Sequence, residues 1–258
     1  MSATTGYYIP GDSWLHARHP LTKLLGVGFI LLAAFLLPPI FLAPIATGLL
    51  VLALTAGLLA ATVRALRIPA VLLASIVAIN AVLYPGASDP WLALGPFTLT
   101  GEGLTFGLVS AGRLLTVFLA AILFLFTTLA DDLMEALVAR GVSHRIAFVV
   151  LSAVQLVPRM QVRAGAILEA QQARGLSVRG SPARRLRALV PLIGPVVLGS
   201  LVDVRERTFA LEARGFGAGS HRTAYRLVID PPIDRWLRWG LGAASTAVVV
   251  GALLGVGR

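Results

Sequence analysis

The sequence has no cysteine and few charged side chains. Without cysteine, the 258-residue chain can form no disulfide framework, no thiolate metal site and no thiol nucleophile, and its redox compartment cannot be inferred. Charged residues account for only 13% of the chain, whereas hydrophobic residues account for 57%, and the mean hydropathy is +0.85. This composition excludes an ordinary soluble domain and indicates a protein of the lipid bilayer.

Motifs for nucleotide binding and catalysis are also missing. The sequence has no Gly-x-x-x-x-Gly-Lys-Ser/Thr phosphate loop, so this chain is not expected to hydrolyse nucleotide itself. The acidic group Asp131, Asp132 and Glu135 is similar in pattern to a diphosphate–magnesium site, but the second acidic cluster that such a site needs is absent. The four histidines show no metal-ligand spacing: His16, His19, His144 and His221. We therefore expect no catalytic residue, no metal site and no cofactor bound by this chain.

Long apolar stretches predict membrane-spanning helices. No residue is charged in 24–37 or in 41–63. Pro38 and Pro39 between these runs, with Pro44 just after them, predict a tight helical hairpin outside the cytoplasm, or a turn inside the membrane. Three more runs are long enough to cross a bilayer: 68–84, 104–130 and 241–256. We expect an all-α polytopic membrane protein with about five transmembrane helices and long amphipathic cytoplasmic helices.

Basic residues are distributed unevenly. Arg18 and Lys23 precede the first span and Arg64 and Arg67 follow the second, whereas the loop 85–103 contains no lysine or arginine. The segment 131–238 holds sixteen of the twenty-two basic residues. The positive-inside rule therefore places the N-terminus and this segment in the cytoplasm of a multi-pass cell-membrane protein.

The net charge of +10 raises the question of a nucleic-acid partner. The arginines are spread along apolar helical patterns, without interleaved aromatic residues or a recognisable binding module. Topology and anionic lipid at the inner leaflet explain most of the excess charge. We expect membrane lipid, and no nucleic acid, to contact this chain.

The expected organisation has three parts. Residues 1–130 form an N-terminal membrane domain with four transmembrane helices, residues 131–225 form a cytoplasmic region, and residues 226–258 form a C-terminal transmembrane helix. The cytoplasmic region is expected to contain a short helix and then two long ones.

The cytoplasmic helices have identifiable boundaries. The short helix has Asp131 and Asp132 in its first turn, where the helix dipole favours them, and ends at Gly141; its cap is expected to be Thr127 or Thr128. The first long helix covers 143–174 and is bent at Pro158; the second covers 182–214 and is bent or interrupted at Pro191 and Pro195.

Each long helix ends in the same tripeptide, Ala173-Arg174-Gly175 in the first and Ala213-Arg214-Gly215 in the second. One interpretation is an ordinary helix ending, because a cation suits the negative end of the dipole, glycine accepts a left-handed conformation, and Leu176 or Phe216 can fold back on the last turn. The other interpretation is that two matched guanidinium groups dock on a partner. Repetition in a membrane protein favours docking.

Three segments together resemble one family, the transmembrane T component, EcfT, of energy-coupling-factor transporters, which includes the CbiQ and BioN permeases. The segments are the N-terminal run from Leu15 through His16, Pro20 and Lys23; the helix from Pro158-Arg159 through Arg163 to Gly175; and the run from Arg207 to Phe216. The resemblance covers nearly the whole chain. His19 departs from it, standing where aspartate is common, as do Gln171 and Gln172, where charged residues are more usual.

The resemblance implies a non-enzymatic subunit that couples ATP hydrolysis to import. Two ABC-type ATPase subunits, with their own ATP and Mg, are expected to receive the two tripeptide ends, and a separate small membrane S component to bind the substrate. A cobalt ion, biotin, a thiamine precursor or another vitamin is compatible with it. The residues expected to dock or to support docking are Ala173, Arg174, Gly175, Ala213, Arg214 and Gly215, with support from Arg159, Arg163, Arg207 and Glu212.

Two other functions remain open. The chain could be the permease domain of a conventional ABC importer, in which intramembrane polar residues line the substrate path, although Asn80 and Arg113 are few for that purpose. Alternatively, Arg113 pairs with Glu102 or with a neighbouring span. The third reading, a lipid-acting membrane enzyme, lacks a candidate catalytic group.

Overall fold

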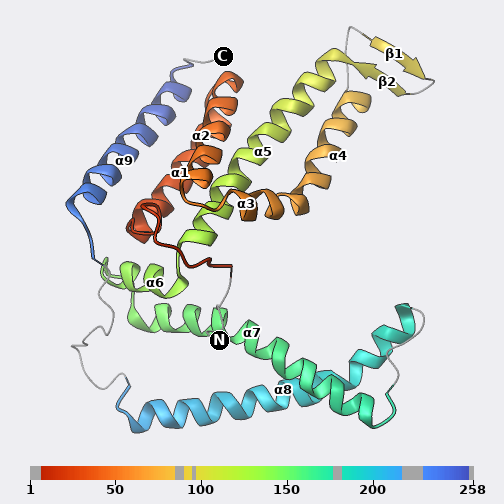
Figure 1. Ribbon diagram of the computed structural model, residues 1–258, viewed down its shortest axis with the longest axis vertical. Coiled ribbons are helices and arrows are strands. Elements are labelled where there is room, and N and C mark those ends of the chain that lie inside the picture. The colour runs from red at the N-terminus through yellow and green to blue at the C-terminus, as the bar shows by residue number, and fades with distance from the viewer. Residues whose placement is uncertain (1–6, 85–89, 95–96, 177–181, 217–228, 256–258) are drawn as a thin grey trace. The chain divides into compact units, whose positions relative to one another are not determined.

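The computed structural model describes residues 7–84, 90–94, 97–176, 182–216 and 229–255. The chain divides into two compact units, Met1–Arg140 with Val228–Arg258 and Gly141–Leu227. The described residues are almost entirely helical (Figure 1), so the all-α expectation is confirmed. The three-part division into membrane and cytoplasmic segments stays a prediction.

The first unit begins with helix α1, Pro20–Leu36. Pro20 occupies the first turn, where a missing N–H costs nothing, and the His19 imidazole accepts a hydrogen bond from the Leu21 backbone N–H at 3.2 Å. The expected turn at Pro38 and Pro39 is present as the short 3₁₀ helix η1, Pro39–Phe41, and leads directly into α2, Leu42–Thr55.

The expected second span, 41–63, is not one helix. Helix α2 ends at Thr55 because Gly57 adopts a left-handed conformation with φ +71°, and the short helix α3, Leu59–Ala65, follows. Leu58 is buried at this break, and its N–H bonds to the Ala53 carbonyl at 2.8 Å. Helix α3 then meets α4, Arg67–Leu83, at an angle of 53°.

A small antiparallel hairpin precedes the longest helix of this unit. Strands β1, Pro90–Leu94, and β2, Phe97–Thr100, pair with each other. The Thr100 hydroxyl then accepts a hydrogen bond from the Gly103 N–H at 3.2 Å and caps helix α5, Gly101–Thr127. These strands were not expected from the sequence.

Helix α5 lies at the centre of the first unit, where it contacts α1, α2 and α4. Leu49 and Ala53 of α2 pack against Leu119, Ala120 and Leu123 of α5. Small residues allow close approach elsewhere along α5: a Cβ added to Gly107 would lie 3.0 Å from the Val77 Cα of α4.

Two more helices complete this unit, α6, Ala130–Val138, and α9, Pro232–Leu253. Asp131 and Asp132 lie in the first turn of α6 as expected, but the expected threonine cap is wrong. Thr127 ends α5, where its hydroxyl donates to the Leu123 carbonyl at 2.7 Å, and the N-cap residue of α6 is Leu129, without a side-chain hydrogen bond. Helix α6 also stops three residues before Gly141.

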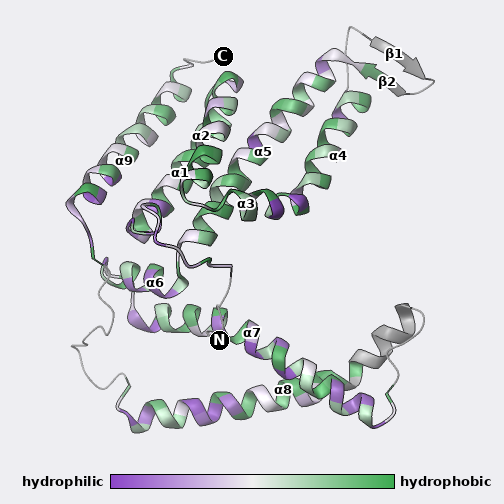
Figure 2. Cartoon of the chain, viewed as in Figure 1, coloured by the Kyte–Doolittle hydropathy of each residue, from purple (hydrophilic) through white to green (hydrophobic). Residues whose placement is uncertain are grey.

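The second unit consists of two long helices, α7, His144–Ala173, and α8, Pro182–Ala213. Both expected helices are confirmed, and neither Pro158 nor the prolines of α8 interrupt them. The two helices cross (Figure 1), and polar residues recur along both, whereas α2 and α5 are more uniformly apolar (Figure 2).

Three described helices are long and apolar enough to cross a membrane: α5, α7 and α9. The bent pair α3 and α4 makes a fourth candidate, while α1 and Pro39–Thr55 are shorter apolar helices. The chain is therefore a polytopic membrane protein. Helix α7 is one of the candidate spans by length and composition, so its expected placement in the cytoplasm stays a prediction.

Candidate functional site

The Ala-Arg-Gly end of α7 forms a Schellman ending. Arg174 is the C-cap residue, and Gly175 adopts the left-handed conformation with φ +93°. The Leu176 N–H donates to the Gln171 carbonyl at 3.0 Å, and the Gly175 N–H donates to the Gln172 carbonyl at 3.0 Å. These two bonds satisfy carbonyls that the helix end would otherwise leave unpaired.

The end of α8 has the same geometry. Gly215 has φ +72°, the Phe216 N–H donates to the Leu211 carbonyl at 2.9 Å, and the Gly215 N–H donates to the Glu212 carbonyl at 2.9 Å. Arg214 therefore holds the position that Arg174 holds in α7. The structural interpretation of the repeat is confirmed, and it leaves both guanidinium groups exposed at a helix end.

Arg174 and Arg214 are positioned by the backbone of their helix ends. Among the residues that the structure describes, no ion pair involves Arg174 or Arg214. Each guanidinium lies at the negative end of a helix dipole, which favours its charge. An exposed guanidinium can donate two parallel hydrogen bonds to a carboxylate of another chain.

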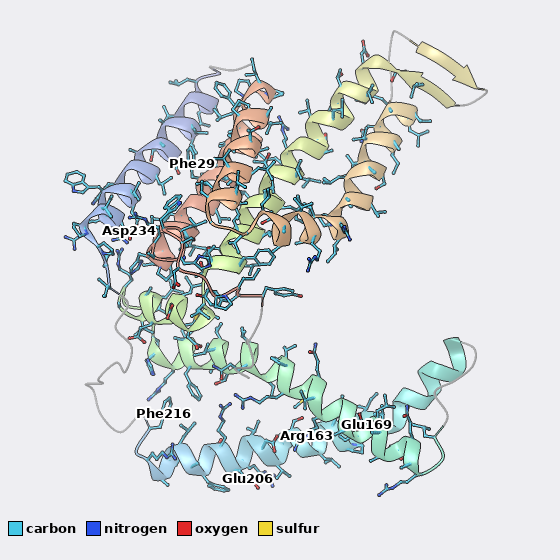
Figure 3. All side chains as sticks on the ribbon, in the orientation of Figure 1. Phe29, Arg163, Glu169, Glu206, Phe216 and Asp234 are labelled. Carbon is cyan, nitrogen blue, oxygen red and sulfur yellow. The ribbon has the colours of Figure 1, made fainter. Side chains whose placement is uncertain are left out.

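Phe216 anchors the end of α8 to the start of α7. Its ring centroid lies 4.9 Å from that of Phe148 and 6.3 Å from that of His144. This side chain follows the second glycine, and both of these ring contacts are with α7. Figure 3 shows Phe216 at one end of the helix pair and Glu169, close to Arg174 in sequence, toward the other.

The two helices are joined at their crossing by a charged pair. Arg163 of α7 makes two hydrogen bonds to Asp203 of α8, one of them from Nη2 to Oδ1 at 3.1 Å. The guanidinium lies against Gly199, where an added Cβ would be 3.1 Å from the Arg163 Cζ. The Ser200 hydroxyl also approaches the Met160 sulfur at 3.4 Å.

The expected support residues have different environments. Arg163 joins the two helices directly, whereas the Arg159 side chain donates a hydrogen bond within α7, from Nη2 to the Gln155 Oε1 at 3.1 Å. Arg207 and Glu212 are exposed on α8, and the Glu212 backbone carbonyl takes part in the Schellman ending. The sequence pattern did not indicate Asp203 or Gly199. Asp203 lies forty residues after Arg163, and Gly199 lies forty residues after Arg159.

The N-terminal motif has structural roles in the first unit. The Lys23 ammonium donates to the Thr127 carbonyl at the end of α5 at 2.6 Å and to the His16 carbonyl at 3.3 Å. The His16 ring bonds through Nδ1 to the Ser13 hydroxyl at 2.7 Å and through Nε2 to the Ile9 carbonyl at 3.0 Å. The motif thus joins the N-terminal segment, α1 and α5.

A second polar network joins the first turns of α1 and α9. Asp234 is completely buried, and its Oδ2 accepts a hydrogen bond from the His19 backbone N–H at 3.1 Å (Figure 3). Arg238 donates to both oxygens of Asp230, at 2.7 and 2.9 Å, and to the Thr22 hydroxyl at 3.3 Å. The Arg238 hydrogen bonds hold the pKa of Asp230 below its usual value.

Burial lowers the pKa of His19, because desolvation disfavours the imidazolium. The neutral form is also the one that can accept the Leu21 N–H at the start of α1. Arg238 and Arg140 lower this pKa further, whereas Asp230 and Asp234 oppose them.

The intramembrane polar residues form no shared site among the described residues. Asn80 donates to the Ile76 carbonyl of its own helix at 2.8 Å. Arg113 lies over the Phe35 ring, with its Cζ 6.0 Å from the centroid, and within the described part of the chain its Nε has no hydrogen-bond partner. The described residues contain no group of three or more His, Asp or Glu side chains suited to a metal, and His221 lies outside them.

Known proteins are similar to this chain over the segments described above. A family described as CbiQ, cobalt transport protein, matches residues 11–225, a range that includes the N-terminal motif and both Ala-Arg-Gly ends. The chain is 29% identical to the energy-coupling factor transporter transmembrane protein EcfT of Heliobacterium modesticaldum, over 88% of each protein. It is 30% identical to the EcfT of Lacticaseibacillus paracasei, over 86% of this chain and 88% of that protein.

A further relative is much longer. It is a Bifidobacterium longum protein named as an ABC transporter ATP-binding protein, 28% identical over 95% of this chain but only 32% of its own length. In that protein, a segment similar to nearly the whole of this chain is therefore continuous with other sequence in one polypeptide.

Proposed function

Because the chain belongs to the CbiQ family of cobalt transport proteins, in which it is an EcfT-type energy-coupling transmembrane component, we propose that it couples ATP hydrolysis in partner subunits to import of a vitamin or transition-metal ion. The chain hydrolyses nothing itself. Two cytoplasmic ABC-type ATPase subunits bind ATP and Mg, and a separate membrane S component binds the substrate.

The repeated helix ending is the observation that carries the proposal. Two helices of one unit each end in an exposed arginine, with the same cap geometry and the same hydrogen bonds. A single such end is an ordinary helix stop. Two matched ends suit a pair of similar partner subunits, and each guanidinium can pair bidentately with a carboxylate in a partly dry groove.

The relatives support ATPase partners. Proteins named as transmembrane components of energy-coupling factor transporters match most of this chain. The Bifidobacterium longum relative is named for ATP binding and contains a segment similar to this chain in about a third of its length. We propose that this chain meets the corresponding ATP-binding subunits as separate proteins, on the cytoplasmic side where its N-terminus and α7 and α8 lie.

The described residues give less support to the two alternatives. A conventional importer needs polar groups along a substrate path, but Asn80 is bonded to its own helix and Arg113 lies on Phe35. A lipid-acting enzyme needs a catalytic group, and no relative described above is named as a lipid-acting enzyme. Selectivity among cobalt, biotin and thiamine precursors is assigned to the S component.

Co-purification tests the proposal. Tagged wild-type chain, isolated from its own cells in mild detergent, is expected to recover two ATPases and a small membrane protein, and Arg174→Glu/Arg214→Glu to lose the ATPases. Losing one member of a buried charge pair costs about 2–5 kcal/mol, or more than a tenfold loss of affinity at each site. The matched control is Arg179→Glu/Arg222→Glu, which reverses the next arginine after each motif, at positions outside the described residues.

Two results would contradict the proposal. Wild-type chain that is folded and recovers no ATPase would favour a membrane enzyme or scaffold. Equal ATPase recovery by the wild type and the Arg174→Glu/Arg214→Glu variant would show that the two arginines do not dock. In a partly assembled complex, the same variant is expected to separate ATP hydrolysis from uptake.

A further inference from the structure

Two side-chain contacts at the crossing of α7 and α8 have the same offset in the sequence. Met160 touches Ser200, and Arg163 pairs with Asp203, so each residue meets the one forty positions later. The two docking arginines, Arg174 and Arg214, are also forty positions apart. The crossing and the two helix ends therefore share one internal repeat.

In both helices the same number of residues separates the ion pair from the terminal arginine. Arg163 precedes Arg174 by eleven residues, and Asp203 precedes Arg214 by eleven residues. Eleven residues are about three helical turns, or about 16 Å along the axis, so each arginine lies close to the helical face of the charged residue in its own helix. A two-fold axis through such a contact would exchange residue i with residue i+40, and therefore Arg174 with Arg214.

We propose that Arg163 and Asp203, seated on Gly199, form the pivot of a two-fold-like lever that presents Arg174 and Arg214 as equivalent contacts to two ATPase subunits related by a two-fold axis. This inference rests on the proposed function for the identity of the partners. Arg163, Asp203 and Gly199 are positioning residues, because they act through the geometry of the two ends and touch no partner themselves.

A charged pair suits a pivot because it specifies register. Apolar contacts alone specify register poorly, because a side chain without hydrogen bonds can be replaced at a contact by another of similar size. A slip of one turn moves a helix by about 5.4 Å, which would break both hydrogen bonds between Arg163 and Asp203. Gly199 admits the guanidinium against the α8 backbone, where a larger residue would displace it.

A contact between Phe216 and Phe148 holds the last part of α8 against α7. Phe216, thirteen residues beyond Asp203, reaches Phe148, fifteen residues before Arg163. The end of α8 thus runs back along the first half of α7. A force applied to Arg214 is therefore received by both helices, which is what a lever requires.

Distance measurements between spin labels test the pivot without any partner. The full-length chain has no cysteine, so Gln172→Cys/Glu212→Cys carries labels only at these two exposed positions, forty residues apart. The expected result is one narrow distance distribution that broadens or shifts in Arg163→Asp, in Asp203→Arg and in Gly199→Leu. The charge-swapped Arg163→Asp/Asp203→Arg is expected to restore the distribution, and Arg159→Asp, whose bond stays within α7, to leave it unchanged.

A distribution that stays unchanged in both single reversals would overturn the pivot, as would a charge swap that fails to restore it. In the assembled transporter, the single reversals are expected to lower substrate uptake per ATP hydrolysed while ATPases remain bound, and the swap to recover it. Failure of the proposed function would appear separately, as absence of ATPases from the wild-type complex with the distance result intact.

Discussion

The Lys23 Nζ donates a 2.6 Å hydrogen bond to the carbonyl of Thr127, the last residue of α5. The ammonium group of one helix thus satisfies a carbonyl at the end of another, 104 residues away in sequence. Its second bond, to the His16 carbonyl, adds the N-terminal segment to the same junction. The lysine of the N-terminal motif therefore has a structural role that requires both its charge and its length.

Lys23→Met keeps most of the side-chain volume and removes the ammonium group. We expect the free energy of unfolding to fall by about 1.5–3 kcal/mol, because a charge-assisted hydrogen bond is lost and the Thr127 carbonyl loses a partner. Thermal unfolding in detergent should show a lower midpoint, by about 2–4 °C per kcal/mol. Arg64→Met, which removes an exposed cation, is the control; equal midpoints for the two variants would contradict the assigned role.

Close packing of α4 on α5 depends on Gly107. A Cβ there would lie 3.0 Å from the Val77 Cα and 3.1 Å from its carbonyl oxygen, so the two backbones must separate to admit it. Gly107→Val is expected to destabilise the protein by about 1–3 kcal/mol. The control is Gly48→Val in α2, because a Cβ at Gly48 meets nothing within 4 Å. The measurement is the thermal midpoint of each variant, and a loss of the same size in both would show that the close approach is not the cause.

Stability should depend on pH through His19. Burial lowers its pKa in the folded state below the ordinary value of 6.5, so the unfolded chain binds the proton more readily. The stability that this neutral cap contributes is therefore present above pH 6.5 and is lost as pH falls through the folded-state pKa. We expect the wild-type midpoint to fall between pH 7.5 and pH 5, about the range over which a histidine titrates.

His19→Asn isolates that effect. Asparagine can accept the Leu21 N–H as an N-cap but does not titrate, so the midpoint of this variant should fall less over the same range. Asp230 does not confuse the comparison, because its pKa is lowered from 3.8 and its contribution is lost only at more acidic pH. Equal pH dependence in wild type and variant would show that another group is responsible.

Local sequence signals predicted much of the helical structure. The apolar runs and Pro182 marked α5, α7, α8 and α9, and each Arg-Gly pair marked a helix end that the structure confirms in bond-by-bond detail. These features depend on residues within one or two turns of one another. The threonine cap of α6 was wrong because Thr127 bonds backward within α5, a competing local choice that the pattern does not distinguish.

The candidate site was only partly predictable, because local sequence signals do not identify partners that are distant in the chain. Arg174 and Arg214 could be selected from a repeated tripeptide, but Asp203 and Gly199 could not, because a partner forty residues away becomes recognisable only when two helices cross. Asp234 was likewise an ordinary acidic residue in the sequence and is completely buried in the fold.

Sequence alone determined that this is an α-helical membrane protein with two arginine-tipped helices, since composition, helix period and glycine stops act locally. Tertiary structure decided where the apolar run after Pro39 breaks, which charge meets which, and that the two arginine-tipped helices cross at one ion pair. Those outcomes depend on the packing of helices that are distant in sequence, and the number of alternative pairings leaves them undetermined until the chain is folded.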